Sequence, residues 1–299
     1  MRFPENVAET KWAVALSGGA DSTALLCRCL EAGIPVTALH YNHGFADENG
    51  DEAETFCREL CESLGVPLIV GRCEDAWFGR PTKEVFARNH RLAFFAEVMS
   101  AQGLTGLMLG HQADDRAENL ILRLARGCGL SGLTSFSWKG ALPGAPQIRL
   151  WRPLLDEHHA DQIAWLKAHS RHWVEDISNA DTSIPRNAIR RELIPHLPHF
   201  VDGANASADI LAEEDAYLQA LAEAATEVAT SETLTLRAGI HPVLARRALH
   251  TWCPTLNRAW LDGLLALPVG AIVQVPSGLR LKKIAAFSWQ NLGLCKGRD

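Results

Sequence analysis

The chain has 299 residues, of which 47% are hydrophobic and 21% charged, a composition typical of a folded protein and a length sufficient for two domains. Its net charge of −6 argues against a large nucleic-acid-binding surface, although basic clusters at 123–126, 186–191 and 280–283 leave room for a local basic face. No apolar run approaches the roughly 20 residues that cross a membrane, and the first residues lack the apolar core of a secretory signal, so we expect a cytoplasmic protein.

The first half of the chain alternates strand-like and helix-like segments. Compact apolar runs predict strands at 12–16, 35–43, 66–73 and 104–111. Helical spacing of apolar residues predicts helices at 21–33, 53–65, 83–103 and 114–129. Strands that alternate with helices predict a parallel sheet covered on both faces, with ligands bound beyond the carboxyl ends of the strands.

The second half gives weaker patterns. Residues 133–160 are rich in Gly, Pro and Trp and favour a loop with room for one strand. Further along, we expect a helix at 158–170 and a polar loop that leads into a short basic helix at 175–197. A long Ala- and Glu-rich helix at 205–230 and a strand-like end at 271–289 follow. We therefore predict a Rossmann-like α/β domain at 1–200 and a smaller, mainly helical domain at 201–299.

Residues 17–22, Ser-Gly-Gly-Ala-Asp-Ser, connect the first predicted strand to the first predicted helix. Glycines at such a turn let backbone N–H groups approach an anion, and the helix N-terminus favours negative charge. The lysine of the G-x-x-x-x-G-K-[ST] loop is absent. A simple strand-to-helix turn with Ser or Asp as the N-cap is the alternative.

Acidic residues follow the fourth predicted strand, which ends at His111. Asp114, Asp115 and Glu118 open the next helix, and the last two share one helix face. Acidic residues often stabilise a helix N-terminus without any other role. Next to a phosphate loop, however, three carboxylates also suit a Mg²⁺ ion and an attacking amine. His43, after the second strand, is a weaker candidate for a position beside ATP.

Eight cysteines are spread along the chain without the paired spacing of a metal knuckle, and a chain of this size needs no disulfides. We expect reduced thiols. Cys57 and Cys61 are four residues apart and fit helix packing, whereas Cys73 and Cys128 are better placed for chemistry but isolated.

The motif S-G-G-x-D-S after an apolar strand resembles the PP-loop ATP pyrophosphatases. A wider series of motifs resembles the tRNA(Ile)-lysidine synthase family, over roughly residues 10 to 200 and more loosely beyond. The series comprises "SGGADS", "HYNHG", "ARNHR", "GHQADDRAEN", "LRLARGCGLSGL", "RPLL" and "SNADTSIPRNAIRRELIPHL".

This resemblance implies that ATP adenylates the C2 oxygen of the wobble cytidine in the tRNA(Ile) that bears a CAU anticodon, with release of pyrophosphate. The side-chain amine of free L-lysine then displaces AMP. ATP and Mg²⁺ are the implied cofactors, and tRNA(Ile) and L-lysine the implied partners, with no membrane. The second domain would position the tRNA, and a homodimer is among the possible oligomeric states.

The resemblance also implies roles for individual residues. ATP and pyrophosphate would be bound by Ser17, Gly18, Gly19, Ala20, Asp21, Ser22, His43 and His111. Asp21 and Asp114 would hold Mg²⁺. Asp21 would also be catalytic, Asp115 and Glu118 would receive the lysine amine, and Arg88 or Arg91 would lie near the lysine carboxylate. Arg186, Asn187 and Arg190 would steady the tRNA or the nucleotide.

Three positions differ from the usual pattern of the family. Asn119 stands where threonine is usual, Leu92 where tyrosine is usual, and Phe45-Ala46 where leucine and arginine are usual. These differences keep two alternatives open: a divergent PP-loop enzyme that modifies another RNA, for example by thiolation, and a tRNA-binding module without catalysis.

Overall fold

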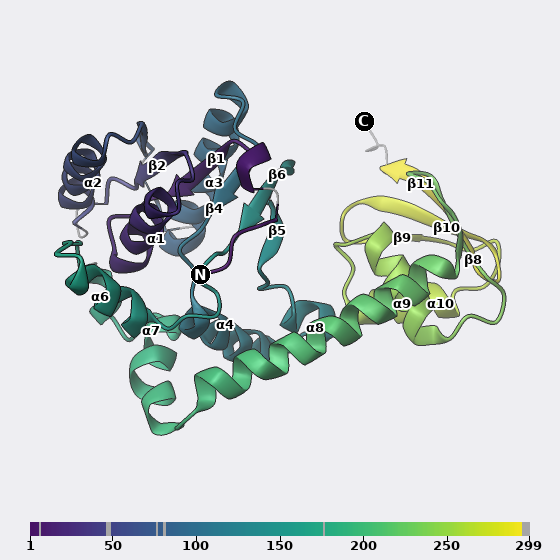
Figure 1. Ribbon diagram of the computed structural model, residues 1–299. Coiled ribbons are helices and arrows are strands. Elements are labelled where there is room, and N and C mark those ends of the chain that lie inside the picture. The colour runs from purple at the N-terminus through teal and green to yellow at the C-terminus, as the bar shows by residue number, and fades with distance from the viewer. Residues whose placement is uncertain (6, 46–48, 76, 80–81, 176, 295–299) are drawn as a thin grey trace. The chain divides into compact units, whose positions relative to one another are not determined.

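The computed structural model describes residues 1–299 except 6, 46–48, 76, 80–81, 176 and 295–299, and Figure 1 shows its ribbon. The chain forms two compact units, Met1–Asp209 and Ile210–Asp299. Helix α8 (Phe200–Ala224) contains the boundary between them in the sequence. No helix in the described part of the chain is long and apolar enough to cross a lipid bilayer.

A six-stranded sheet with the order β3-β2-β1-β4-β6-β5 forms the centre of the first unit. Neighbouring strands are parallel except for the pair β5–β6, which is antiparallel. The strands are β1 (Trp12–Ala15), β2 (Val36–Asn42), β3 (Leu68–Arg72), β4 (Gly106–Met108), β5 (Lys139–Leu142) and β6 (Ala145–Trp151). The predicted parallel sheet with alternating helices is thus confirmed.

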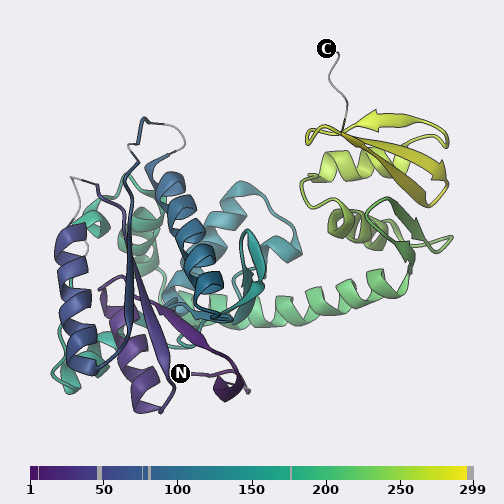
Figure 2. The ribbon, with the colours of Figure 1, turned by 90° about the horizontal axis from the view of Figure 1, so that it is seen from above.

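Helices cover both faces of this sheet, as Figure 2 shows. The longer ones are α1 (Ala20–Glu31), α2 (Gly50–Leu64), α3 (Lys83–Ala101), α4 (Ala113–Arg126) and α6 (His159–Ala168). Short helical segments complete the unit: η1 (Val7–Glu9), α5 (Leu130–Leu133), η2 (Ile177–Ala180), α7 (Pro185–Ala188), η3 (Ile189–Leu193) and η4 (Ile194–His196).

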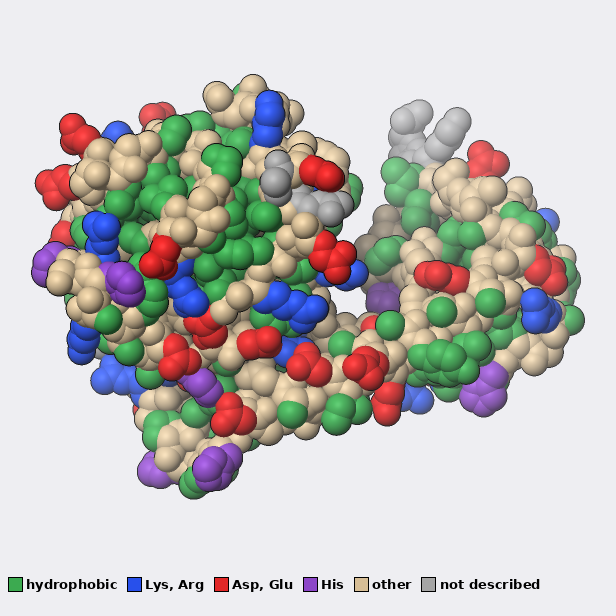
Figure 3. All heavy atoms as spheres, viewed as in Figure 1, with side chains coloured by type: hydrophobic (Ala, Val, Ile, Leu, Met, Phe, Trp, Pro, Cys, Tyr) green, Lys and Arg blue, Asp and Glu red, His purple; other side chains and the backbone are tan. Residues whose placement is uncertain are grey.

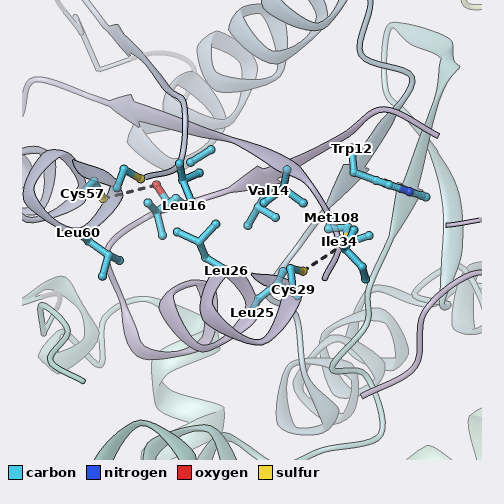
Figure 4. Close-up of a cluster of buried hydrophobic side chains, with 14 of the residues drawn as sticks. Trp12, Val14, Leu16, Leu25, Leu26, Cys29, Ile34, Cys57, Leu60 and Met108 are labelled. Atoms are coloured by element: carbon cyan, nitrogen blue, oxygen red, sulfur yellow. Dashed lines mark hydrogen bonds between the residues drawn. The ribbon is translucent and has the colours of Figure 1, made fainter. Parts of the chain in front are cut away.

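The central strand β1 shows why both faces are buried. Trp12 and Val14 pack into one apolar cluster with residues of α1 and α2 (Figure 4). Ala13 packs into a second cluster with Phe95 and Met99 of α3. Successive side chains of a strand point to opposite faces, so one short apolar run supplies both cores.

The strand order places a topological switch point at the carboxyl end of the sheet. From β1, the chain continues to β2 on one side, whereas β4 lies on the other side. The segments that follow β1 and β4 therefore diverge, and ligands of parallel α/β folds bind at such a switch point. The segment that follows β6 lies at the same edge, because β6 is parallel to β4.

The second unit has a five-stranded antiparallel sheet with the order β7-β8-β11-β10-β9. Its strands and helices are β7 (Thr226–Ala229), β8 (Thr233–Leu236), α9 (Pro242–Trp252), α10 (Arg258–Ala266), β9 (Ile272–Gln274), β10 (Leu279–Ala285) and β11 (Ser288–Leu294). The core includes Trp289, which is fully buried and donates its indole N–H to the Leu264 carbonyl at 3.1 Å. The long helix and the strand-like end of the expectation correspond to α8 and to β9–β11. β7 lies in residues that we expect to be helical from the sequence, and β8, α9 and α10 are not predicted individually.

Lys283 changes the interpretation of the basic run at 280–283. Its side chain is buried, donates from Nζ to the Leu265 carbonyl at 2.6 Å, and lies 5.6 Å from the ring centre of Trp289. Desolvation lowers the pKa of Lys283. This lysine therefore packs in the core of the second unit and adds nothing to a basic surface.

Candidate active site

The Ser-Gly-Gly turn leaves β1 and enters α1 in a conformation that suits an anion site. Gly18 has a φ of +90°, a backbone conformation that residues other than glycine rarely adopt. Ser22 Oγ accepts the Ser17 backbone N–H at 3.1 Å and lies 3.0 Å from Ser17 Oγ. The Gly18 carbonyl accepts the backbone N–H of Val174 at 2.9 Å. The loop is thus held from within and from outside, and the first N–H groups of α1 have no partner within the helix.

The segment after β4 lies directly against this loop. A side chain at Gly110 would meet the backbone nitrogen of Ser22 at 3.0 Å, so only glycine fits without displacement. This contact brings His111 and the start of α4 next to the loop. The structure therefore brings together the two segments that the sequence indicates on either side of the switch point.

Asp21 and Asp114 both contact His159, at the start of α6. Asp21 Oδ1 lies 2.8 Å from His159 Nδ1, and Asp114 Oδ2 accepts the His159 backbone N–H at 3.0 Å. Desolvation raises the pKa of Asp21, whereas the hydrogen bond to Asp21 raises the pKa of His159. Three or more metal-binding side chains do not gather anywhere in the described residues. Two neighbouring carboxylates nevertheless suit Mg²⁺, which commonly takes one or two carboxylates plus phosphate oxygens.

Asp115 and Glu118 lie in the first turns of α4 and are 8% and 0% exposed. Asp115 Oδ2 accepts the Gln112 backbone N–H at 3.1 Å, and the Gln112 side chain accepts the Asp115 backbone N–H at 3.4 Å. These bonds form a capping box. One oxygen of Asp115 therefore serves the helix N-terminus, as the simpler interpretation of these acidic residues predicts.

Arg186 and Arg190 bind the other carboxylate oxygens. Arg186 donates from Nη2 to Asp115 Oδ1 and from Nε to Glu118 Oε2, both at 2.7 Å. Arg190 donates from Nε to Glu118 Oε1 at 2.5 Å and from Nη2 to Asp115 Oδ1 at 3.3 Å. Although desolvation opposes their charged forms, the two carboxylates raise the pKa of both arginines. We refer to these four residues as the ion cluster.

The ion cluster joins two groups that the resemblance assigns to different tasks. The carboxylates are expected to receive an amine, and the arginines to contact tRNA or the nucleotide. The third member of that basic segment, Asn187, is buried and donates to the Asp181 carbonyl at 2.9 Å. In this state it supports the loop before α7.

Arg88 and Arg91 lie one helical turn apart on α3 and are exposed. Within the described residues, no hydrogen bond or ion pair engages either guanidinium. Two uncompensated cations are a suitable environment for an anionic group such as a carboxylate.

His111 and His43 occupy different surroundings. His111 follows β4, accepts the Arg152 Nε–H at Nδ1 over 3.3 Å, and has its pKa lowered to about 4, chiefly by burial. His43 follows β2, where its ring lies 5.2 Å from Tyr41 and 5.9 Å from Phe45. His111 is thus built into the site by a direct polar contact with Arg152, whereas His43 packs among aromatic rings.

Arg152 and His159 are polar residues of the site that sequence reasoning missed. Arg152 belongs to the motif "RPLL", which directly follows a strand and whose residues carry no role in the sequence prediction. His159 stands at the start of a helix that looks merely amphipathic in the sequence. For Arg152, the available indication was its position directly after a strand. For His159, it was the pair of histidines at the start of a helix.

Of the three positions that differ from the usual pattern of the family, Leu92 and Asn119 lie wholly in the described part of the chain. Leu92 packs against the apolar cluster beside α3, so its change from a polar ring is accommodated within the core. Asn119 Nδ2 is buried without a hydrogen-bond partner. Phe45 stacks near His43, and Ala46 lies outside the described residues.

The thiols of the described residues are free. Burial raises the pKa of Cys57 to about 12 and that of Cys61 to about 11, so both remain protonated at neutral pH. Cys73 and Cys128 are only partly buried. Helix packing therefore explains the first pair, as expected, and protonated thiols are poor nucleophiles.

Figure 3 shows how charge is distributed on one face of the molecule. Basic side chains on this face are interspersed with acidic ones and do not gather into one continuous field. This distribution agrees with the net charge of −6. Any nucleic-acid contact on this face would therefore use local groups of cations.

Comparisons with known proteins agree with the motifs. Residues 1–197 match the PP-loop domain family. The tRNA(Ile)-lysidine synthase of Shigella flexneri is 33% identical over 296 residues, which cover 95% of this chain and 62% of that protein. The tRNA(Ile)-lysidine synthase of Pseudomonas aeruginosa is 37% identical over 275 residues, which cover 86% of this chain and 60% of that protein. The resemblance to such synthases is confirmed, and the chain spans about three fifths of their length.

A solved structure gives an independent comparison of the fold. The U34-tRNA thiolase NcsA from Methanococcus maripaludis, determined with its [4Fe-4S] cluster, superposes with a TM-score of 0.56. The match covers 68% of this chain and 72% of that chain, at 18% sequence identity. At this level of identity, the two proteins share a fold and nothing further follows.

Proposed function

Because this chain belongs to the PP-loop domain family, we propose that it uses ATP to attach L-lysine to the wobble cytidine of the tRNA(Ile) with a CAU anticodon. The match to tRNA(Ile)-lysidine synthases over 95% of the chain carries this proposal. In the first step, the C2 oxygen of cytosine attacks the α-phosphorus of ATP, and pyrophosphate leaves. In the second step, the lysine amine attacks C2, loses a proton, and AMP leaves with the oxygen.

The loop at residues 17–22 is the proposed site for pyrophosphate. The positive φ of Gly18 and the two serine hydroxyls suit an anion at the N-terminus of α1. Asp21 and Asp114 would hold Mg²⁺, which suits their shared position at His159. When bound, the ion would neutralise charge on the leaving pyrophosphate.

Asp115 and Glu118 are the proposed acceptors of the lysine side chain. A free lysine amine is protonated at neutral pH, with a pKa of about 10.4, and two carboxylates favour its approach and can take its proton. The lysine would have to share these carboxylates with Arg186 and Arg190, which are 35% and 39% exposed. Those arginines would then be able to turn toward a tRNA phosphate or the nucleotide.

Two further parts of the chain have proposed roles in substrate binding: the arginines of α3, and the second domain. Arg88 and Arg91 would bind the carboxylate of free lysine, which supports recognition of an amino acid over a simple amine. We infer that residues 201–299 position the tRNA.

A thiolation reaction is the less favoured alternative. Thiolation by cysteine chemistry needs an accessible thiol of low pKa. Burial raises the pKa of Cys57 and Cys61, which opposes that role. A tRNA-binding module without catalysis would have no need for the buried ion cluster beside the loop.

The test is analysis of the tRNA product. Purified protein is incubated with ATP, MgCl₂, isotopically labelled L-lysine and transcribed tRNA(Ile) with a CAU anticodon, and the digested nucleosides are examined by mass spectrometry. We expect a labelled lysidine nucleoside that requires all four components, and none with the Asp115→Asn variant. Labelled thionucleoside from a sulfur donor, or tRNA binding without any modification, would replace the proposal with one of the alternatives.

A further inference from the structure

Arg152 and His111 lie at the ends of two neighbouring parallel strands. β4 pairs with β6, and Met108 is opposite Trp151 in the register. Because both strands point the same way, Arg152 and His111 emerge at the same edge of the sheet. There, Arg152 Nε donates a hydrogen bond to His111 Nδ1 over 3.3 Å.

Three further contacts fix the Arg152 guanidinium and its backbone. Nη1 donates to the Ser137 carbonyl at 2.6 Å, and the guanidinium lies 4.8 Å from the ring centre of Phe136. The Arg152 backbone N–H donates to the Trp138 carbonyl at 2.9 Å. The same Phe136 ring meets His111 edge-on at 5.0 Å. Arg152 and His111 are therefore oriented by one shared aromatic side chain.

The direction of this hydrogen bond determines where the imidazole proton is. Burial lowers the pKa of Arg152 to about 10, so it remains a cation at neutral pH. A guanidinium can only donate, and His111 Nδ1 must therefore accept through its lone pair. The imidazole is then neutral, with its proton on Nε2. Within the described residues no hydrogen bond engages Nε2, so this N–H is available to a ligand.

We propose that Arg152 is a positioning residue that holds His111 as the neutral Nε2–H tautomer, so that His111 donates a hydrogen bond to a substrate oxygen. The identity of that oxygen rests on the proposed function: it is the oxygen that bridges C2 of cytosine and the α-phosphorus. Negative charge develops on this oxygen when AMP leaves. A fixed N–H donor stabilises such charge without a proton transfer.

The charges around His111 support a donor role over that of a general base. Burial is the main cause of its lowered pKa. The positive charges of Arg152, Arg186 and Arg91 lower the pKa further, and Asp115 opposes them. An imidazole that accepts a proton only near pH 4 is a weak base at neutral pH, whereas its N–H remains a competent donor.

The first test reads the imidazole directly by NMR. The ring nitrogens of ¹⁵N-histidine-labelled full-length protein are recorded without substrates from pH 5 to pH 8, and the Asn variant of His111 assigns the resonance. We expect an unprotonated Nδ1 and a protonated Nε2 across this range. In Arg152→Met, the signal should become a mixture of tautomers with a pKa moved toward the ordinary value of about 6.5. A wild-type Nδ1–H, or an unchanged spectrum in the variant, overturns the proposal.

The second test separates positioning from folding. In the lysidine assay, Arg152→Met should lower kcat by roughly 10- to 100-fold while KM for ATP and tRNA changes little, because a misaligned donor affects mainly the transition state. Arg152→Lys keeps a cationic donor and should recover part of kcat. Arg149→Met is the matched control, because Arg149 lies on β6, three residues before Arg152, and donates to Thr10 instead. Equal losses in Arg149→Met and Arg152→Met overturn the proposal.

The two tests also distinguish this inference from the proposed function. If the wild-type protein forms no lysidine, the proposed function fails, and the NMR spectrum still decides the tautomer. If Arg152→Met does not fold, the wild-type spectrum and Arg152→Lys remain as readouts. A normal activity together with a wild-type Nδ1–H tautomer overturns the inference alone.

Discussion

Glu118 shows how a single residue ties stability to chemistry. Its carboxylate has no exposed surface, and an unpaired charge in that position would be strongly destabilising. Arg186 and Arg190 make its burial tolerable by three hydrogen bonds. The residue proposed to receive the substrate amine is therefore also one that the fold must keep paired.

The two adjacent arginines at 190 and 191 provide a matched test of the ion cluster. Arg190→Ala removes a partner of buried Glu118, and we expect the free energy of unfolding to fall by about 1–3 kcal/mol. This loss is below the range for fully buried ion pairs because Arg190 is 39% exposed. Among the described residues, the Arg191 side chain forms a single long hydrogen bond, to the Asn179 carbonyl at 3.5 Å. Arg191→Ala should change stability by less than about 0.5 kcal/mol. Urea denaturation measures both, and equal losses would remove the stabilising role of the cluster.

His40, which contacts Leu16 just before the loop at residues 17–22, gives a prediction about pH. It is 3% exposed and donates from Nδ1 to the Leu16 carbonyl at 2.9 Å, and its Nε2 is buried with no hydrogen-bond partner among the described residues. Burial lowers its pKa. The unfolded chain therefore binds a proton below about pH 6.5 that the folded chain does not, so this contribution to stability is present above that pH and lost as pH falls.

The measurement compares unfolding free energies from pH 8 to pH 5. In wild type, His40 should contribute a loss of up to about 1.4 kcal/mol per pH unit below pH 6.5, and His40→Asn should lack this share. His250→Asn, at an exposed position on α9, serves as the control and should keep the wild-type slope. Parallel slopes in all three proteins would contradict the prediction.

The sequence indicates some site residues and hides others for a physical reason. Asp21 and Asp114 stand next to recognisable elements, the loop and the helix start, and the structure brings them to a common neighbour. That neighbour, His159, is 138 residues from Asp21. Only the packing of α6 against α1 brings the two together, and a contact of that kind leaves no local pattern in the sequence.

At the scale of elements, the N-terminus of α4 links helix formation to the site. Gln112 caps the helix, and its backbone N–H orients Asp115. We expect Gln112→Ala to cost about 1 kcal/mol of stability, as loss of an N-cap typically does. We also expect it to reduce kcat, because the backbone N–H groups of Asp114 and Asp115 lose their acceptor and the first turn of α4, which carries Asp115, is held less firmly. Asn257 caps α10 in the second unit and accepts the Trp260 N–H at 3.1 Å. Asn257→Ala should cost similar stability without loss of kcat.

The two measurements must diverge for the prediction to hold. Thermal or urea unfolding gives the stability of both variants, and the lysidine assay gives kcat. If both caps affect kcat equally, general destabilisation explains the effect and Asp115 is not oriented by the cap. If Gln112→Ala leaves kcat unchanged, the capping box serves the helix alone.

The elements that the sequence predicts best are the buried parallel strands. β1 is a continuous apolar run because both of its faces are covered, and this pattern is readable without any other information. β5 and β7 have mostly exposed side chains, so neither carries a strong apolar pattern. Their pairing with β6 and β8 depends on hydrogen bonds to a neighbouring strand, which composition does not reveal.

At the scale of the whole molecule, two separate cores account for the two units. The first unit has apolar clusters on both faces of its parallel sheet. The second unit has its own cluster, which includes Trp289 and Leu281. The sequence predicts a boundary near residue 200, where a Pro-containing turn precedes a long helix. The structural units divide at Asp209, inside α8. A continuous helix shows no change of composition at this point, so the sequence pattern does not reveal where the division lies.

Because each unit has its own core, we expect two cooperative unfolding transitions in calorimetry. Trp289→Ala removes a fully buried side chain and its hydrogen bond to Leu264, which should lower the stability of one transition by about 3–5 kcal/mol. The other transition should keep its midpoint.

ATP should raise the midpoint of that unaffected transition in wild type and variant alike, since the proposed ATP site lies in residues 1–209. Tyr217→Ala, a change at an exposed position in the second unit, controls for substitution in that unit as such. A single transition that shifts as a whole in Trp289→Ala would mean that the two cores unfold together, and the assignment of ATP binding and stability to separate units would then fail.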